Sequence, residues 1–450
     1  MELKKYKKKR ITPQGWKEVT LADAFNTSSG ATPLSTEASY YENGTIPWIN
    51  SGELASPYIY GTTNFISQAG FENSSTEIYP IDTVLVAMYG ATAGKASLLK
   101  MEACTNQAIC AILPNKDYSS TFLKYSIDTL YDHLVGLSSG SARDNLSQAE
   151  LKKLKLIMPP TKDEQNKLVS ILALIDRKIE LNRAINQNLE AMAKQLYDYW
   201  FVQFDFPNEN GRPYKSFGGK MVWNEKQRKY IPEYWEVKSL SNWLEIKSGF
   251  PFKSETYKPI GRYKIITIKN VQDGELVTSG CDYVNDIPSR AKDYISLQIG
   301  DRLISLTGNC GRLCVVCEEN LLLNQRVGLL CCDAIYLEYF YNFLNSGTMR
   351  TVIDNLANGA AQANLSPVEL CKTDCFIPPI DILLSYNRKV NAIRKAIVQN
   401  NQEISQLAKQ RDELLPLLMN GQVSVNSDLS VYKKRRGKVP SSIQNDVSDI

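Results

Sequence analysis

The sequence predicts an α+β protein with two similar globular domains and two long helices that pair with each other as an antiparallel coiled coil. Two helix-like stretches, residues 163–200 and 383–419, each follow a pair of prolines. Proline is compatible with the start of a helix but not with its interior, so each pair marks the place where a helix begins. Pro159 and Pro378 are 219 residues apart, which predicts an internal repeat.

Residues 163–200 form the first long helix of this prediction. They contain neither Pro nor Gly, and a helix of this length makes a rod of roughly 55–60 Å at a rise of 1.5 Å per residue. Read as heptads, the stretch has one apolar seam, interrupted by Lys178 and Asn182: Leu168, Ile171, Ile175, Ile185, Leu189, Met192, Leu196 and Tyr199. An apolar seam of this length needs a partner helix.

The second helix-like stretch supplies that partner. Its apolar stripe is interrupted by Asn400 and Arg411 and consists of Val390, Ile393, Ile397, Ile404, Leu407, Leu414 and Leu418. We therefore expect both helices to pair within one chain. Polar residues inside a seam fix the register of a coiled coil, which is the role expected of Asn182 and Asn400.

The repeat extends along the globular parts of the chain. Matching landmarks recur in one order: Pro13, Trp16 and Leu21 with Pro232, Trp235 and Leu240; Asp82 with Asp301; Asn106-Gln107 with Asn324-Gln325; and Asn145-Leu146-Ser147 with Asn364-Leu365-Ser366. The predicted boundaries are a basic tail (1–10), a first globular domain (11–158), a central helix (159–200), a connector (201–231), a second globular domain (232–377), a C-terminal helix (378–420) and a polar tail expected to be disordered (421–450).

Composition places the chain among ordinary globular proteins. Its 450 residues suffice for two domains and a rod, and its net charge of +4 neither requires nor excludes nucleic acid. Basic clusters at residues 4–10 and 433–436 are either solvated tails or weak phosphate contacts. The first residues lack an apolar core and no run of 18 apolar residues occurs, so a secretory signal and a membrane span are not expected. We expect a cytoplasmic protein whose ten cysteines are reduced thiols.

Catalytic signatures are weak in this sequence. The one histidine, His133, lies on a helix-like stretch, and the second half of the chain offers no equivalent base. The run Gly90–Ala96 resembles a phosphate-binding loop, but its glycines are one residue too close and Ala96 stands where a Ser or Thr would bind Mg²⁺. Motifs for methyl transfer and S-adenosylmethionine binding are not evident. We predict a binding protein that is not an enzyme and carries no cofactor.

Three cysteines lie close together in the second half of the chain. Cys310, Cys314 and Cys317 form a C-x3-C-x2-C pattern, which can hold an iron–sulfur cluster. The equivalent stretch of the first half, residues 90–98, has no cysteine, and Val315-Val316 is typical of a buried strand. The sequence therefore favours buried thiols and no metal.

Two similar modules on a rod suit a target with two separated parts. DNA is such a target, because its major groove faces one side once per turn of about 34–36 Å. Arg, Lys, Asn and Gln read base edges, while Ser, Tyr and backbone amides contact phosphates. The candidates are Trp48, Asn50, Ser51, Tyr89, Lys95, Asn106, Gln107, Arg143 and Asn145 in the first domain, and Lys269, Asn270, Asn309, Arg312, Asn324, Gln325, Arg326, Gln362 and Asn364 in the second. For each of them, a role as a turn, cap or solvated residue is the alternative.

The ordered motifs resemble a known family. The run from Asp82 to Lys95 followed by Asn106-Gln107, the segment Gly140–Leu151, and the sequence PPTKDEQNKLVSILALID before a long helix are similar to specificity subunits of type I restriction–modification systems. The resemblance covers nearly the whole chain. It implies two target-recognition domains that each read half of a bipartite, asymmetric double-stranded DNA sequence, and helices that set the gap between the halves.

The resemblance also implies partners. Two modification subunits, which methylate adenine with S-adenosylmethionine, would dock on the helices, and motor–endonuclease subunits would join them in host defence. The Glu164-Gln165 pair at the start of the first helix is the implied docking contact, whereas the second helix has Leu383-Leu384 there. The rival interpretation is a cytosolic scaffold that holds protein partners on a coiled-coil spacer.

Overall fold

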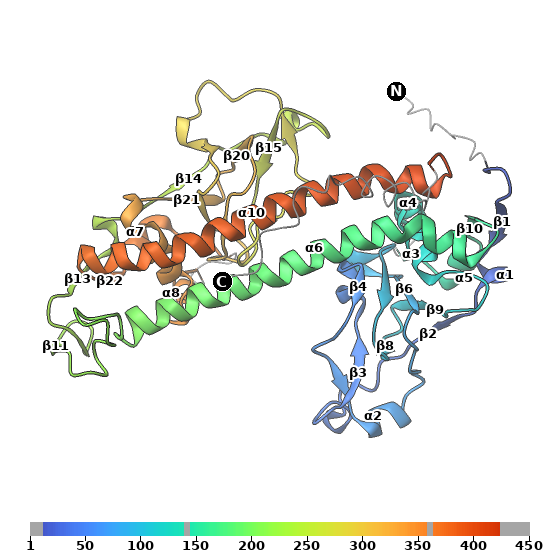
Figure 1. The fold of residues 1–450 in the computed structure, drawn as a ribbon, viewed down its shortest axis with the longest axis horizontal. Helices are drawn as coiled ribbons and strands as arrows, with labels where there is room; N and C mark the ends of the chain where they lie inside the picture. Colours follow the sequence, from blue (N-terminus) through green and yellow to red (C-terminus); the bar gives the residue numbers. More distant parts are fainter. Residues whose placement is uncertain (1–11, 139–144, 358–362, 424–450) are drawn as a thin grey trace, which may run out of the picture. The chain divides into compact units, whose positions relative to one another are not determined.

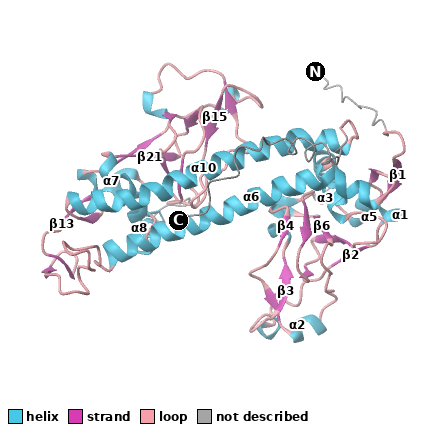
Figure 2. Cartoon of the chain, in the orientation of Figure 1, coloured by secondary structure: helices cyan, strands magenta, loops and turns pink. Residues whose placement is uncertain are grey.

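The computed structural model describes residues 12–138, 145–357 and 363–423. The chain divides into two units: a first unit of Met1–Arg177 and Leu407–Ile450, and a second unit of Lys178–Gln406. The long helices α6 (Lys162–Tyr197) and α10 (Ile380–Met419) each contribute to both units (Figure 1). The strands gather in the globular parts, as Figure 2 shows.

The first unit holds a five-stranded and a three-stranded sheet. The five strands lie in the order β2 (Thr27–Ser29), β9 (Ile109–Ile112), β6 (Val84–Ala87), β7 (Ala96–Leu99) and β4 (Tyr58–Ile59); the three are β5 (Phe65–Ile66), β3 (Ile46–Ile49) and β8 (Cys104–Thr105). Strand β6 is apolar throughout because both faces of the sheet are covered. Val84 and Val86 pack beside Phe122, while Leu85 and Ala87 pack on the other face.

The second unit has the same kind of two-sided packing. One four-stranded sheet is β14 (Glu245–Ser248), β21 (Val327–Cys331), β18 (Arg302–Ser305) and β19 (Leu313–Val315); the other is β16 (Tyr283–Val284), β15 (Tyr263–Ile266), β20 (Leu321–Leu323) and β17 (Ser296–Leu297). Adjacent residues of β18 face different cores, since Leu303 packs with Ile265 and Ile304 packs with Phe340.

Short helices and turns complete the described chain. In the first unit they are α1 (Leu21–Ala24), α2 (Gln68–Glu72), α3 (Ser120–Asp128), α4 (Tyr131–Ser138), α5 (Gln148–Lys152) and the 3-10 turns η1 (Ala38–Tyr40), η2 (Ser51–Ala55) and η3 (Gly90–Thr92). In the second unit they are the π-helical turn η4 (Asp198–Val202), η5 (Leu240–Asn242), η6 (Ser254–Thr256), η7 (Asp293–Ile295), α7 (Ala334–Leu344), α8 (Gly347–Ala357), α9 (Pro367–Cys371) and the hairpin β11 (Met221–Asn224) with β12 (Lys229–Pro232).

The repeated Asn-Leu-Ser segment starts a short helix in each unit. The Ser147 hydroxyl accepts from the Glu150 amide at 3.2 Å, and the Glu150 carboxylate accepts from the Ser147 amide at 2.8 Å, which forms a capping box for α5. Ser366 caps α9 through the Glu369 amide at 3.3 Å. Local chemistry therefore explains why this segment folds alike twice.

A two-stranded antiparallel pair closes each globular part. Strand β1 (Lys17–Thr20) pairs with β10 (Lys155–Met158), and β13 (Glu236–Ser239) pairs with β22 (Asp374–Ile377). In both cases the chain leaves the second strand and enters a long helix within a few residues. The repeat offset and the domain boundaries themselves stay predictions from the sequence.

The long helices pair in antiparallel fashion, as the sequence predicts. In the first unit, Arg411 Nη1 donates to Asp176 Oδ1 at 3.1 Å. In the second unit, Asn182 Nδ2 donates to Glu403 Oε2 at 2.8 Å, and Glu190 forms an ion pair with Arg394. The residue numbers rise along α6 as those of their partners fall along α10.

Asn182 and Asn400 do not pair with each other. Asn400 instead donates to Asn186 Oδ1 at 2.9 Å, and Asn186 donates to Asn401 Oδ1 at 2.8 Å. Amide pairs of this kind are satisfied only when the two helices stand in one register, so they specify the alignment.

One of the two heptad rows predicted to form the apolar seam of α6 is exposed and not buried. Ile171, Ile185 and Met192 are 40%, 47% and 53% exposed, and Tyr199 is exposed as well. The buried row lies one residue further along, at Gln165, Leu172, Ile179, Ala193 and Trp200. The hydropathy pattern misled because this buried row includes the polar Gln165 and the half-buried Asn186, whose side chains are hydrogen-bonded.

The other predicted seam residues are buried or half-buried. Asn182, Val390, Ile397 and Ile404 are buried; Leu168, Ile175, Leu189, Leu196, Ile393, Asn400 and Leu407 are half-buried. Helix α6 also packs on the globular parts, since Val169 and Leu172 join the core around Phe122, and Ala193 and Tyr197 join that around Phe340. No helix in the described part of the chain has the length and apolar character that crossing a bilayer requires.

Candidate nucleic-acid interface

The Asn106-Gln107 turn connects β8 to β9 in the first unit. Its backbone is held by the Asn106 amide, which donates to the Ile49 carbonyl at 3.0 Å. The Asn106 side chain accepts from the Ala108 amide at 3.2 Å and donates to Asn50 Oδ1 at 3.2 Å. Asn106 therefore shapes the turn, and Gln107 is the exposed residue on it.

The Asn324-Gln325 turn connects β20 to β21 in the second unit. Asn324 is 6% exposed, and its amide donates to the Ile266 carbonyl at 3.1 Å. Its side-chain oxygen accepts from the Arg326 amide at 3.4 Å, and the Gln325 amide donates to the Phe250 carbonyl at 3.1 Å. Asn324 is therefore structural, while the side chains of Gln325 and Arg326 are exposed.

Several first-unit candidates form hydrogen bonds within the globular domain. Trp48 is 8% exposed and its indole donates to the Ala31 carbonyl at 3.0 Å. The Asn50 amide donates to Glu53 Oε1 at 2.9 Å, and the Ser51 carbonyl accepts from Thr92 Oγ1 at 2.8 Å. These interactions favour the structural alternative for Trp48, Asn50 and Ser51.

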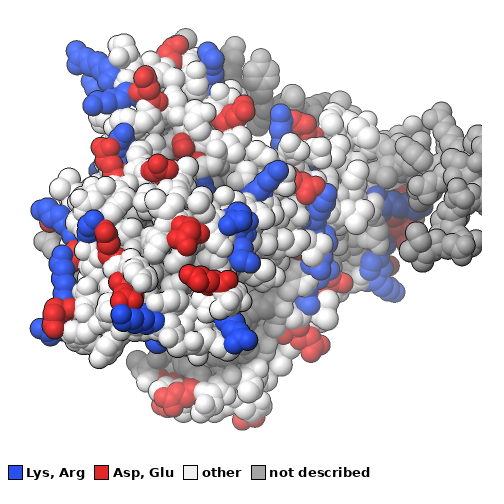
Figure 3. Space-filling view, turned by 60° about the vertical axis from the view of Figure 1, so that its left-hand side comes forward, with Lys and Arg blue, Asp and Glu red and all other residues white. Residues whose placement is uncertain are grey.

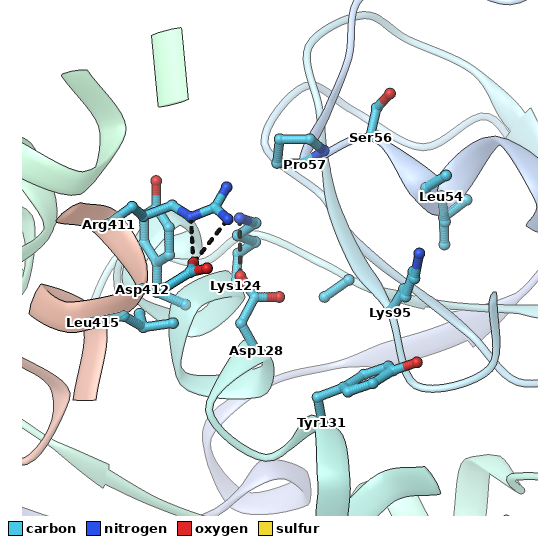
Figure 4. A pocket seen from close by; sticks show the side chains of 13 residues that line it. Leu54, Ser56, Pro57, Lys95, Lys124, Asp128, Tyr131, Arg411, Asp412 and Leu415 are labelled. Atoms are coloured by element: carbon cyan, nitrogen blue, oxygen red, sulfur yellow. Dashed lines mark hydrogen bonds and ion pairs between the residues drawn. The ribbon is translucent and has the colours of Figure 1, made fainter. Parts of the chain in front are cut away.

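Other first-unit candidates are accessible. Tyr89 is 38% exposed at the start of η3, and Lys95 is half-buried on the wall of a cavity of about 330 Å³ (Figure 4). In Figure 4 the Lys95 side chain lies apart from the Lys124–Asp128 and Arg411–Asp412 ion pairs. Asn145 is half-buried before the cap of α5.

The second-unit candidates divide in the same way. Asn270 is 6% exposed, accepts from the Thr267 amide at 2.8 Å and donates to the Val277 carbonyl at 2.8 Å, so it is structural. Arg312 is half-buried and donates to Gln272. The exposed candidates are Lys269, Asn309, Gln325, Arg326 and Asn364.

Two cavities bring most of these exposed residues together. Gln325, Arg326 and Asn364 border a cavity of about 750 Å³, and Gln325, Arg326 and Lys269 border another of about 400 Å³. Ser248 and Thr307 of the first cavity and Tyr257 of the second were not singled out from the sequence. Their only signal is proximity in the sequence to turn glycines such as Gly249 and Gly308.

The remaining predicted positions lie outside the described residues. Arg143 and Gln362, which occupy matching places before Asn145 and Asn364, belong to this group, as do the basic clusters at both ends of the chain. On the face drawn in Figure 3, Lys and Arg are interspersed with Asp and Glu. Selective contact on that face therefore depends on individual side chains and not on a uniform field.

The two residues of the predicted docking pair, Glu164 and Gln165, differ in exposure. Gln165 is fully buried: its Nε2 donates to the Pro159 carbonyl at 3.0 Å, and its Oε1 accepts from the amide of Ser119, the N-cap of α3, at 2.8 Å. Glu164 is exposed and its carboxylate accepts from the Thr161 amide at 3.3 Å. The pair thus starts α6 and joins it to α3. In α10, Leu383 is buried and Leu384 is exposed.

The cysteine trio lies in the core of the second unit. The Cys310 thiol donates to the Leu306 carbonyl at 3.4 Å, and Cys317 accepts from Asn401 at 3.4 Å. Burial raises the pKa of Cys317 to about 11 and that of Cys314 well above its usual range, which disfavours the thiolate that a metal needs. Within the described ranges no group of three metal-ligating side chains occurs, and His133 is exposed on α4.

Comparison with known proteins gives a consistent result. Residues 13–191 match the family model of the type I restriction modification DNA specificity domain. The chain is 28% identical to the type I restriction enzyme MjaIX specificity subunit of Methanocaldococcus jannaschii, over 92% of this chain and 94% of that one. It is 25% identical to the HindI specificity subunit of Haemophilus influenzae, over 66% and 74%.

A solved structure has the same fold. The S subunit of a type I restriction–modification system from M. genitalium superposes with a TM-score of 0.52 at 15% identity, covering 90% of this chain and 96% of that one. At this identity the likeness concerns the fold alone.

Proposed function

We propose, from the premise that this chain belongs to the family of type I restriction–modification specificity subunits, that it provides the DNA sequence specificity of such a complex. Each globular domain reads one half of a bipartite, asymmetric target in double-stranded DNA. The chain also docks two adenine-methyltransferase subunits and the restriction motor–endonuclease subunits. The domains are those of residues 11–158 and 232–377, with residues 201–231 as the connector.

The observation that carries this proposal is the parallel construction of the two units. Each has a globular part closed by the same kind of strand pair, and each packs on its own stretch of the α6–α10 pair. The two Asn-Gln turns carry different side chains, because Gln107 is followed by Ala108 and Gln325 by Arg326. Different side chains on similar supports favour two different half-sites. The relatives do not support the alternative of a protein scaffold.

In this proposal the chain itself catalyses nothing. Its residues bind and orient DNA, and methyl transfer takes place on the modification subunits, which bind S-adenosylmethionine. The candidate residues that are exposed are of the kinds that contact base edges and phosphates: Tyr89, Gln107, Lys269, Asn309, Gln325, Arg326 and Asn364.

The proposal is tested with the chain co-purified with its modification subunits. We expect binding to DNA that contains one bipartite sequence, with an affinity that falls steeply as salt rises, because phosphate contacts release counterions. Mapping of methylated adenine on genomic DNA should return two unlike half-sites with a fixed gap. A complex that forms but methylates no defined sequence would refute the proposal.

The exposed apolar row of α6 is the surface that we assign to docking of the modification subunits. Leu181, Ile185 and Met192 are 46–53% exposed at heptad-like spacing in the second unit, and Leu174 is exposed in the first. A paired helix that also presents an apolar heptad row can accept a further helix there. We propose this surface in addition to the exposed Glu164, because Gln165 is buried.

Replacing Ile185 by Glu should weaken capture of a modification subunit about tenfold, because the new carboxylate must be desolvated in the contact; tenfold corresponds to about 1.4 kcal/mol. Lys395→Glu, on an exposed position of α10, is the matched control and should leave capture unchanged. The measurement is subunit titration by size-exclusion chromatography with circular dichroism to verify folding. Equal capture by both variants would place docking elsewhere.

A further inference from the structure

The two Asn-Gln turns share three supporting hydrogen bonds. The Asn106 and Asn324 amides donate to the Ile49 and Ile266 carbonyls, at 3.0 and 3.1 Å. Both side-chain oxygens accept from the amide two residues later, at 3.2 and 3.4 Å. The amide three residues later, in Ile109 or Val327, donates back to the Asn carbonyl at 3.3 and 3.0 Å.

A glycine that directly follows a strand packs against the residue before each turn: Gly30 after β2 and Gly249 after β14. A Cβ added at Gly30 would lie 1.9 Å from the Thr105 carbonyl oxygen, and one added at Gly249 would lie 2.2 Å from the Leu323 carbonyl oxygen. Only glycine permits this approach. The backbone of both turns is thus held from two sides, and the two residues after Asn are presented on a rigid support.

The residues on that support differ in one position. Gln107 corresponds to Gln325, whereas Ala108 corresponds to Arg326. Gln107 accepts a hydrogen bond from Thr32. Among the described residues, no hydrogen bond or ion pair engages the Arg326 guanidinium, although its backbone amide is bonded to Asn324. An exposed guanidinium whose N–H donors are free can donate hydrogen bonds to a bound molecule.

Two cavities and several polar side chains surround Arg326. Arg326 and Gln325 border both cavities described above, so they stand on the ridge between them. Ser248, Thr307 and Asn364 line one side, and Thr307 Oγ1 is buried without a partner among the described residues. Arginine pairs bidentately with O6 and N7 of guanine in the major groove, and glutamine pairs with adenine.

We propose that the Asn-Gln turn is the shared reader of both domains, and that Arg326 recognises a guanine in the half-site of the second domain. Ala108 has no side-chain donor, so the first domain reads through Gln107 at this turn and does not demand that guanine. The inference rests on the proposed function and adds to it the residue that makes the half-sites unequal.

The test compares Arg326→Ala, Arg326→Lys and Ala108→Arg in the complex with modification subunits, by mapping methylated adenine on genomic DNA. Arg326→Ala should relax one guanine in one half-site, with discrimination reduced roughly 5- to 150-fold and the gap unchanged. Arg326→Lys keeps the charge but loses the planar fork, so it should relax the same position. Ala108→Arg should alter only the other half-site.

Three outcomes would overturn the inference. One is an unchanged motif in Arg326→Ala. Another is uniform weakening on all DNA that Arg326→Lys restores, since that identifies a phosphate contact. The third is an Ala108→Arg variant that alters the same half-site as Arg326→Ala. Failure of the proposed function is separate, because the unaltered complex would then have no methylation motif.

Discussion

Replacing Glu338 by Gln should lower the free energy of unfolding of the second unit by about 3–5 kcal/mol at neutral pH. Glu338 lies on α7, is 3% exposed, and pairs with Arg302 of β18 and Arg394 of α10. Arg394 also pairs with Glu190 of α6, and its guanidinium lies 4.6 Å from the centre of the Tyr341 ring. Gln has nearly the same shape as Glu but is neutral, so the buried guanidinium groups of Arg302 and Arg394 lose the negative charge that compensates them.

The effect should depend on pH in a defined direction. Burial raises the pKa of Glu338, but Arg302 and Arg394 outweigh it and hold the pKa below the ordinary 4.5. A carboxyl with a depressed pKa stabilises the fold above its unfolded pKa, and this contribution is lost as pH falls through the folded pKa. The difference between the two proteins should therefore be full at neutral pH and shrink in acid below about pH 4.5.

Denaturant titration, with hydrogen exchange to locate the affected helices, measures this loss. Glu369→Gln, which removes an exposed ion pair with Lys372, is the control and should change the transition little. Equal stability of Glu338→Gln and the unaltered chain would contradict the role assigned to the buried network.

The first unit has a similar buried carboxylate, Asp176, which accepts from Tyr125 Oη at 2.6 Å and from Arg411 at 3.1 Å. Asp176→Asn should increase the rate of amide hydrogen exchange in α3 and leave α7 protected.

Adding one heptad to both long helices should widen the gap in the DNA target by one to three base pairs. Insertion after Asn182 in α6 and after Gln402 in α10 keeps opposite positions together, because Asn182 contacts Glu403. Seven residues add about 10.5 Å of helix, which equals about three base pairs. Each added base pair also rotates the major groove by about 34–36°, which limits how far the gap can widen. One base pair is therefore the lower bound of the expected widening.

The reading turns are untouched by this insertion, so the bases recognised should not change. The Glu190–Arg394 and Asp176–Arg411 contacts also stay intact, since they lie on either side of the inserted turns. Mapping of methylated adenine measures both the bases recognised and the width of the gap between the half-sites. Three residues inserted at the same points are the control: they break the heptad phase and should abolish methylation. Persistent activity with an unchanged gap would show that the helices do not set the spacing.

Elements that depend on local chemistry can be predicted from the sequence alone. Pro-Pro pairs, long stretches without early breaks and heptad patterns located α6 and α10, and their similar lengths indicated an intramolecular antiparallel pair. Helix caps such as Ser147 with Glu150 follow from residues three apart, so they are visible in the sequence.

The tertiary structure decided which of several similar polar or apolar residues face inward. Ile171 and Leu172 are adjacent and both apolar, yet only Leu172 is buried, because α6 packs against α10 and a globular core together. Gln165 is buried where its amide finds the Pro159 carbonyl and the Ser119 amide, which lie 6 and 46 residues away in sequence. Asn324 turns inward and Arg326 outward for the same reason: burial of a polar group depends on partners that only the folded chain brings within hydrogen-bonding distance.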